Sequence, residues 1–374
     1  MTLSRKLNHW RRGTRSRRHV IVKKKHWLAG ISLAIGLSFV FWLTSCATPG
    51  RGAGQPPRPM KPFVYSPYLY IHLPPQMDAP TFMSSVLGRV RSLVGLPGND
   101  FPDGVKALTL AFATGECGQE RWDYLSAPQM VDTHLKKLLR ANIDYVISTG
   151  GADGVFTCGS EQGMEAFMAR YDSPQLLGFD FDIEAGQSEA VIQQLVQQVH
   201  AAAQRHPHLR MSFTLAAASA TEPGRPTLNE VGATVMKHIQ QVGLQNYFVN
   251  LMVMNFGEAT PDSCVVDGDR CDMAASAIAV VRHFNQEYGV PLPQIEVTPM
   301  IGVNDLKQNV FTLSDAQRLT RYVHDNQLGG LHFWSINRDG ICPPDGPQDV
   351  SPSCHSLPGL SPLAFTNAFA APVR

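Results

Sequence analysis

Three carboxylates stand at alternate positions in one short apolar run of this chain, at Asp180, Asp182 and Glu184. Side chains of a β-strand alternate between its two faces, so the acids share one face while Phe179 and Phe181 lie on the other. Acids two residues apart on a strand lie roughly 6.5 Å apart, and in apolar surroundings they repel one another unless protons or hydrogen bonds intervene. Such a strand costs stability, which indicates acid–base chemistry at a catalytic site rather than a solvated outer face.

The run 177–184 resembles the D-G-x-D-x-D-x-E signature of glycoside hydrolase family 18, the family of the chitinases. Asp180, Asp182 and Glu184 stand where that signature has its three functional acids. Leu177 takes the place of the opening Asp. Leu177 lies an odd number of residues from each acid, so strand alternation puts it on the opposite face, where we expect it to pack against a helix.

Eight short apolar runs alternate with amphipathic segments beyond Lys61. The runs are 63–71, 105–113, 143–149, 176–184, 210–216, 247–255, 295–301 and 330–335. Helical patterns between them include 131–140, 188–204, 274–287 and 314–326. Ser314 and Gln317 are the expected capping box of the last helix. The alternation predicts an α/β fold, a (β/α)8 TIM barrel, whose active site lies at the C-terminal ends of the strands.

The end of the third run also resembles the same family. Ser148, Gly150 and Gly151 match its S-x-G-G motif. The resemblance implies that these small residues leave room for the substrate and for the acids of the next strand.

Two later runs carry further candidates for substrate binding. The segment 250–257 resembles the sixth strand of the family, with Asn255 in place of an Asp, so the shape of a hydrogen-bonding group is kept and its charge is lost. Met252 lines the barrel or contacts the ligand. Trp334 matches the tryptophan that floors the central sugar site, where an aromatic ring stacks on the apolar face of a pyranose. An ordinary core position is the alternative for Trp334.

The mechanism that the resemblance implies is substrate-assisted hydrolysis with retention. Glu184 protonates the glycosidic oxygen, Asp182 holds the acetamido N–H, and Asp180 shares a proton or a hydrogen bond with Asp182. The 2-acetamido carbonyl of the sugar attacks the anomeric carbon, so we expect neither a metal nor an organic cofactor. The expected partner is a polysaccharide or oligosaccharide that contains N-acetylglucosamine.

The predicted function is therefore that of a chitinase, a glycoside hydrolase that cleaves β-1,4-linked N-acetylglucosamine in chitin or chitodextrins. An endo-β-N-acetylglucosaminidase acting on N-glycans would use the same acids and stays open. A catalytically inactive chitin-binding lectin is the second alternative, which the presence of Glu184 disfavours. The choice between endo and exo action also stays open.

The N-terminus has the composition of a targeting segment. Residues 1–26 contain ten Lys and Arg and no acid, and residues 27–45 are uncharged and mostly apolar. The apolar stretch ends at Cys46 in a sequence that resembles a bacterial lipobox. We expect a lipoprotein signal peptide over 1–46, a Pro- and Gly-rich tether over 47–61 and the catalytic barrel over 62–374.

This N-terminal pattern predicts an exported protein that a lipid on Cys46 anchors to a membrane, at the bacterial outer membrane or the cell surface. An uncleaved signal anchor is the alternative, because about 19 apolar residues can just span a bilayer. Without the leader, Asp and Glu outnumber Lys and Arg by about nine. A nucleic-acid partner is therefore not expected, and we expect a monomer.

Six cysteines remain after Cys46, an even number in an exported chain. Two local pairs, Cys264 with Cys271 and Cys342 with Cys354, can each close a short loop. Cys117 and Cys158 are left for each other, and both follow strands that neighbour in a barrel. The spacings fit no common zinc pattern, so we expect three disulfides.

Overall fold

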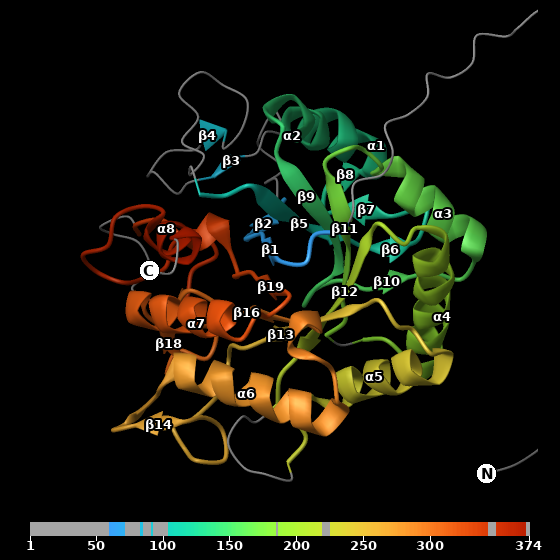
Figure 1. Ribbon diagram of the computed structural model, residues 1–374. Coiled ribbons are helices and arrows are strands. Elements are labelled where there is room, and N and C mark those ends of the chain that lie inside the picture. The colour runs from blue at the N-terminus through green and yellow to red at the C-terminus, as the bar shows by residue number, and fades with distance from the viewer. Residues whose placement is uncertain are drawn as a thin grey trace, which may run out of the picture. The chain divides into compact units, whose positions relative to one another are not determined.

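Eight stretches of the chain supply the parallel strands of one ring in this computed structural model (Figure 1). It describes residues 60–71, 83–84, 91–92, 104–184, 186–218, 225–342 and 349–371. The ring contains β1 (Val64–Tyr65), β2 (Tyr68–Tyr70), β5 (Ala107–Ala113), β9 (Asp144–Gly150), β11 (Leu176–Asp182), β12 (Arg210–Ala216), β13 (Phe248–Met252), β16 (Ile295–Thr298) and β19 (Gly330–Leu331). Each stretch coincides with one of the eight predicted runs, although β9 extends one residue beyond its run, to Gly150.

The first run closes the ring because it pairs on both sides. Its first half, β1, pairs with β19 through Val64 and Gly330, and its second half, β2, pairs with β5 through Tyr68 and Thr109. All neighbouring strands of the ring are parallel, in the order β1-β19-β16-β13-β12-β11-β9-β5-β2. The predicted (β/α)8 barrel is confirmed.

Helices lie outside the ring and follow the strands in the chain (Figure 1). They are α1 (Ala127–Met130), η1 (Val131–Leu135), α2 (Lys136–Ala141), α3 (Glu161–Arg170), α4 (Glu189–Arg205), α5 (Glu230–Val242), α6 (Met273–Tyr288), η2 (Leu292–Gln294), α7 (Leu313–Asp325), η3 (Ile336–Arg338) and α8 (Ala364–Ala370). In the part of the chain that the structure describes, no helix is both long and apolar enough to cross a membrane.

The four predicted helices are all present, with two differences in detail. The predicted helix 131–140 contains the π-helical turn η1 between α1 and α2. The capping box of α7 is formed by Thr312 and Asp315, so the expectation for Ser314 and Gln317 is wrong. Thr312 accepts from the Asp315 N–H, and the Asp315 carboxylate accepts from the Thr312 N–H at 2.8 Å. The shorter Asp takes the place that Glu or Gln usually has in a capping box, and the helix begins earlier than expected.

Five small sheets lie in the loops between these elements. They pair β3 (Met83–Ser84) with β4 (Arg91–Ser92), β6 (Gly115–Glu116) with β10 (Phe156–Thr157), β7 (Arg121–Trp122) with β8 (Leu125–Ser126), β14 (Val266–Asp267) with β15 (Arg270–Cys271), and β17 (Gly302–Val303) with β18 (Val310–Phe311). They belong to loops that leave the C-terminal ends of ring strands. These loops form the rim of the barrel mouth.

Leu177 does not pack against a helix, and that expectation is wrong. The pairing of β11 with β9 skips Leu177 in a bulge between Leu176 and Gly178. Leu177 is buried in a small apolar cluster with Val64, Ala107 and Val146, separate from the large core that holds Phe179, Phe181 and the helix faces. A bulged residue breaks strand alternation, so counting by twos along the sequence gave the wrong face.

The three predicted disulfides are present and join Cys117 to Cys158, Cys264 to Cys271, and Cys342 to Cys354. The first links two neighbouring rim loops, whose strands β6 and β10 also pair directly. Cys46, the leader 1–46 and nearly all of the tether 47–61 lie outside the described residues.

Candidate active site

Strand β11 directs two of the three acids into the barrel. Asp180 and Asp182 are 2% and 4% exposed, and Phe179 and Phe181 on the opposite face belong to the core beneath the helices. Glu184 lies two residues beyond the end of the strand and is partly exposed at the barrel mouth. The acids therefore run from the buried interior of the barrel to its rim.

Asp180 is held by three hydroxyl groups from other strands. Its carboxylate accepts hydrogen bonds from Ser148 Oγ at 2.6 Å, from the Tyr68 hydroxyl at 2.9 Å and from Thr214 Oγ1 at 2.7 Å. Burial raises the pKa of Asp180 above its usual value, and the three hydroxyl donors counteract part of that shift. The proton or hydrogen bond shared with Asp182 that the family resemblance implies stays a prediction.

Asp182 is buried without a comparable set of donors. Burial is the main cause that raises its pKa well above the usual value, and the charges of Glu184 and Asp180 add to the effect. Within the described residues, its Oδ1 atom has no hydrogen-bond partner. A buried polar atom without a partner costs free energy, so Asp182 offers a ready bonding position to a ligand at the barrel mouth.

Glu184 has the pKa of a general acid that works near neutral pH. Burial raises the pKa of its carboxyl to about 7, and the negative charges of Asp153 and Asp305 contribute. Asp153 lies in the loop after β9 and Asp305 in the loop after β17, so two rim loops act on one carboxyl. A carboxylic acid with this pKa is substantially protonated at neutral pH and can deliver a proton.

Aromatic side chains form a floor beside the acids. The Trp334 ring stacks on the Phe112 ring with centroids 5.6 Å apart and planes 17° apart, and Tyr70 lies 5.8 Å from Trp334. Trp334, Phe112 and Tyr70 are each partly exposed, so their rings remain available to a ligand. The sequence analysis identified Trp334 alone. Tyr68 and Tyr70 alternate in β2 as the acids do in β11, and this pattern could have pointed to both.

The glycines of the third run make room for the neighbouring strand and for the floor. A Cβ atom on Gly150 would lie 2.0 Å from the carbonyl oxygen of Asp182, and one on Gly151 would lie 2.7 Å from the Phe112 ring. Both have φ above +80°, which side chains other than glycine rarely adopt. Larger residues at these two positions would displace Asp182 or Phe112.

Strand β13 contributes Asn250 to the network around Asp180. Its amide donates to the Tyr68 hydroxyl at 3.0 Å and to Thr214 Oγ1 at 2.8 Å, and its carbonyl accepts from Thr298. Asn250 thereby fixes the two hydroxyls that bond to Asp180. Met252 ends the same strand and is partly exposed at the mouth, and its contact with substrate stays a prediction.

Asn255 is engaged in holding a rim loop. Its Nδ2 donates to Asp305 Oδ2 at 3.1 Å, its Oδ1 accepts from the backbone N–H of Leu306 at 3.1 Å, and its backbone N–H donates to Asn304. Its φ of +53° is a left-handed conformation that Asn tolerates. A direct contact between Asn255 and substrate stays a prediction.

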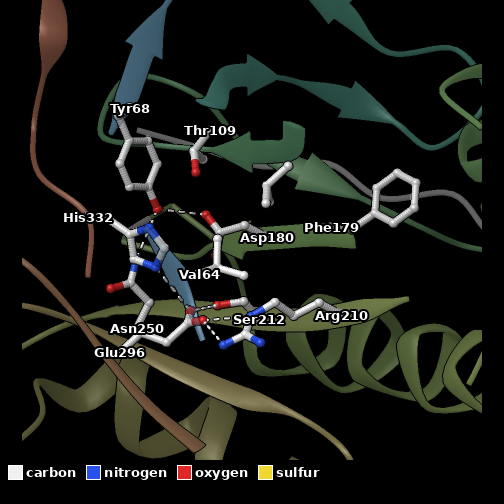
Figure 2. A pocket seen from close by; sticks show the side chains of 11 residues that line it. Val64, Tyr68, Thr109, Phe179, Asp180, Arg210, Ser212, Asn250, Glu296 and His332 are labelled. Carbon is white, nitrogen blue, oxygen red and sulfur yellow. Dashed lines mark hydrogen bonds and ion pairs between the residues drawn. The ribbon is translucent and has the colours of Figure 1, made fainter. Parts of the chain in front are cut away.

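The interior beneath Asp180 is polar and closed. Arg210 donates to Glu296 at 2.8 Å, Ser212 donates to the other oxygen of Glu296, and His332 lies beside that carboxylate. Figure 2 shows this group on one side of the contact between Tyr68 and Asp180. Although burial opposes it, Arg210 holds the pKa of Glu296 well below its usual range.

The cavity among these residues encloses about 10 Å³, which is room for a single water molecule. It is far too small for a sugar ring. Across the described ranges, no three His, Cys, Asp or Glu side chains gather in the way that a metal site requires.

Comparisons with known proteins give two curated relatives that are named as chitinases. No protein-family model matches the sequence. Endochitinase 11 of Metarhizium anisopliae is 29% identical over 219 residues, which cover 55% of this chain and 42% of that protein. The probable bifunctional chitinase/lysozyme of Escherichia coli is 29% identical over 237 residues, which cover 60% of this chain and 26% of that protein. The chain thus spans less than half the length of either curated relative.

A solved structure covers more of the chain. Active domain 2 of a thermostable chitinase from Pyrococcus furiosus, as a catalytic-site mutant complexed with chito-oligosaccharides, superposes with a TM-score of 0.60 and 26% sequence identity. The match covers 84% of this chain and 96% of that one. A match of this length extends far beyond a single motif.

Proposed function

Since this chain belongs to glycoside hydrolase family 18, we propose that it is a chitinase-type hydrolase that cleaves β-1,4 bonds between N-acetylglucosamine units. One arrangement carries the proposal. Glu184, with a pKa of about 7, follows Asp182 by two residues in the sequence. The Oδ1 atom of Asp182 is buried and has no hydrogen-bond partner among the described residues. The aromatic floor around Trp334 lies at the same barrel mouth.

Each acid has a separate role in the proposed reaction. Glu184 donates its proton to the glycosidic oxygen, and the bond to the leaving sugar breaks. The carbonyl oxygen of the substrate's own acetamido group attacks the anomeric carbon and forms an oxazolinium ion. Water then opens that ring, and Glu184 accepts the proton of the water and returns to its acid form.

Asp182 supports the acetamido group during the attack. Its unbonded oxygen accepts the acetamido N–H, and the positive charge that develops on the oxazolinium ring favours the ionised form of this carboxyl, which in turn stabilises that charge. Asp180, held by Ser148, Tyr68 and Thr214, is a fixed neighbour whose charge helps to keep the pKa of Asp182 high. Trp334 and Phe112 support the apolar face of the sugar.

The proposal is tested with the purified full chain in detergent and a series of chito-oligosaccharides from dimer to hexamer. Release of shorter N-acetylglucosamine oligomers with retained anomeric configuration is the expected result. Cleavage of an N-glycan core with no action on chito-oligosaccharides would instead indicate an endo-β-N-acetylglucosaminidase. Tight binding with no cleavage of either substrate would indicate a lectin.

We further propose that the protein is exported and held at a membrane by lipid on Cys46. The basic segment 1–26, the apolar segment 27–45 and the cysteine that follows support this location. Mass spectrometry of the N-terminal peptide from purified membranes tests it. A diacylglyceryl Cys46 as the first residue is expected, and an intact leader with an unmodified Cys46 would favour an uncleaved signal anchor.

A further inference from the structure

The hairpin of β7 and β8 holds an exposed aromatic side chain at the rim of the barrel mouth. Strand β7 pairs with Thr114, the residue after β5, through two backbone hydrogen bonds of 2.8 and 2.9 Å. Asp123 and Tyr124 form the two-residue turn between β7 and β8, and Asp123 has a φ of +47°. Tyr124 is 54% exposed.

The hairpin is anchored on both sides of this turn. Trp122 is fully buried, and its indole N–H donates to the Tyr171 hydroxyl at 2.7 Å. On the other side, Leu125 is buried and the backbone N–H of Ser126 donates to the Gln129 side chain in the cap of α1. The turn that carries Tyr124 is therefore held in place on both sides. Binding of a ligand to Tyr124 costs little conformational entropy of the chain.

The exposure of Tyr124 differs in kind from that of other apolar side chains. In the part of the chain that the structure describes, four large apolar side chains are exposed. They are Tyr124, Val266, Leu306 and Ile341. Single exposed aliphatic residues are ordinary on a protein surface. Tyr124 is the aromatic member of this set, and it has the flat face that a pyranose ring requires.

The tip of the hairpin also lies near the aromatic floor. Tyr70 belongs to that floor through its contacts with Trp334 and Phe112, and Asn337 bonds to the Tyr70 backbone on both its N–H and carbonyl sides. After burial, the groups that raise the pKa of the Tyr70 phenol are Asp123, Asp153 and Tyr124. Strand β7 pairs with Thr114, two residues after Phe112 of the floor, so the hairpin that carries Tyr124 lies beside the floor.

We propose that Tyr124 is a second sugar-stacking residue, which binds a pyranose of the substrate chain beyond the one that lies on Trp334. This inference rests on the proposed function and adds a preference for longer substrates. Asp123 and Asp153 are exposed beside the same path, and their carboxylates accept hydrogen bonds from sugar hydroxyls. Short oligomers occupy the floor at Trp334 and do not reach the hairpin.

The test compares the binding of N-acetylglucosamine trimer and hexamer by calorimetry. The parent is the full chain with Glu184→Gln, which removes turnover during the measurement. Adding Tyr124→Ala should weaken hexamer binding about three- to tenfold and leave trimer binding unchanged. Adding Tyr124→Phe keeps the ring and should leave both affinities within about twofold of the parent.

The outcomes separate this inference from the function on which it rests. If the parent binds both oligomers and Tyr124→Ala changes neither affinity, or weakens both equally, the second stacking position is refuted and the proposed function stands. If the parent binds neither oligomer, both are refuted. The melting temperature of Tyr124→Ala should stay close to that of the parent, because Trp122 and Leu125, which anchor the hairpin, are unchanged.

Discussion

Asn255 donates a hydrogen bond to Asp305 at 3.1 Å, and this contact fixes a rim carboxylate whose charge reaches Glu184. The Asn255 amide is uncharged, but it holds the charged carboxylate of Asp305 in place on the loop after β17. The acid strand β11 and this loop are far apart in the sequence. The pKa of Glu184 is therefore set in part by a residue that lies outside the strand motif.

Replacing Asp305 with Asn should lower the pKa of Glu184, because one of the negative charges that raise it is removed. Glu184 must be protonated to act as an acid, so the alkaline limb of the kcat/KM profile should move to lower pH by a fraction of a unit. The pH profile on a chito-oligosaccharide measures this shift. Asp262→Asn, in an exposed rim position, is the matched control and should leave the profile in place. A shift to higher pH would contradict the assignment.

Glu184→Gln should reduce kcat by about 10² to 10⁴ while oligosaccharide affinity stays within a few-fold. The amide keeps the shape of the side chain and cannot deliver a proton. Steady-state rates with the hexamer, together with calorimetric binding, check both parts. Activity within tenfold of the parent would remove Glu184 from the acid role.

The same substitution should change how stability depends on pH. Glu184 has a pKa of about 7 in the folded protein and about 4.3 in an unfolded chain. The contribution of its protonated form to the free energy of unfolding is fully present below about pH 4 and is lost as the pH rises through 7. At pH 8 the free energy of unfolding of Glu184→Gln should therefore exceed that of the parent by about 1 to 2 kcal/mol. At pH 4 the two proteins should be equally stable. Urea unfolding at the two pH values measures this difference. Glu258→Gln, on the surface, should show no such difference, and a loss of stability at pH 8 would contradict the linkage.

Leu177→Asp should destabilise the protein by several kcal/mol and should not raise activity. The carboxylate would replace an apolar side chain in the cluster of Val64, Ala107 and Val146, where no compensating donor is at hand among the cluster's side chains. Thermal unfolding and hexamer turnover measure the two effects. Leu177→Met, which keeps a similar apolar volume, is the control and should cost less than about 1.5 kcal/mol. A faster enzyme with an unchanged melting temperature would refute this account of position 177.

Removing the disulfide between Cys117 and Cys158 by double substitution with Ser should cost about 2 to 4 kcal/mol of unfolding free energy. The two cysteines are 41 residues apart in the sequence, whereas Cys264 and Cys271 are only 7 apart. A longer closed loop restricts the unfolded chain more, so the first removal should cost more than the second. Urea unfolding of the two double variants makes the comparison. Equal costs would point to native contacts rather than loop length as the source.

Local patterns in the sequence determined the fold and the direction of the acids. Alternation along β11 predicted that Asp180 and Asp182 share one face and Phe179 and Phe181 the other, because a strand reverses its side chains at every residue. The eight apolar runs predicted the barrel, and strand order within it predicted that Cys117 meets Cys158. These features depend on periods of a few residues or on neighbouring strands, which a sequence displays directly.

Features that depend on contacts across the barrel were decided by the tertiary structure. The bulge at Leu177 arises from pairing with β9, which alternation along one strand does not reveal. Tyr68 and Thr214 reach Asp180 from strands on other parts of the ring, and Asp305 acts on Glu184 from a rim loop. Hydrogen bonds and charges depend on distance in space, and the closing of the ring brings these residues together from positions more than 30 residues apart in the sequence.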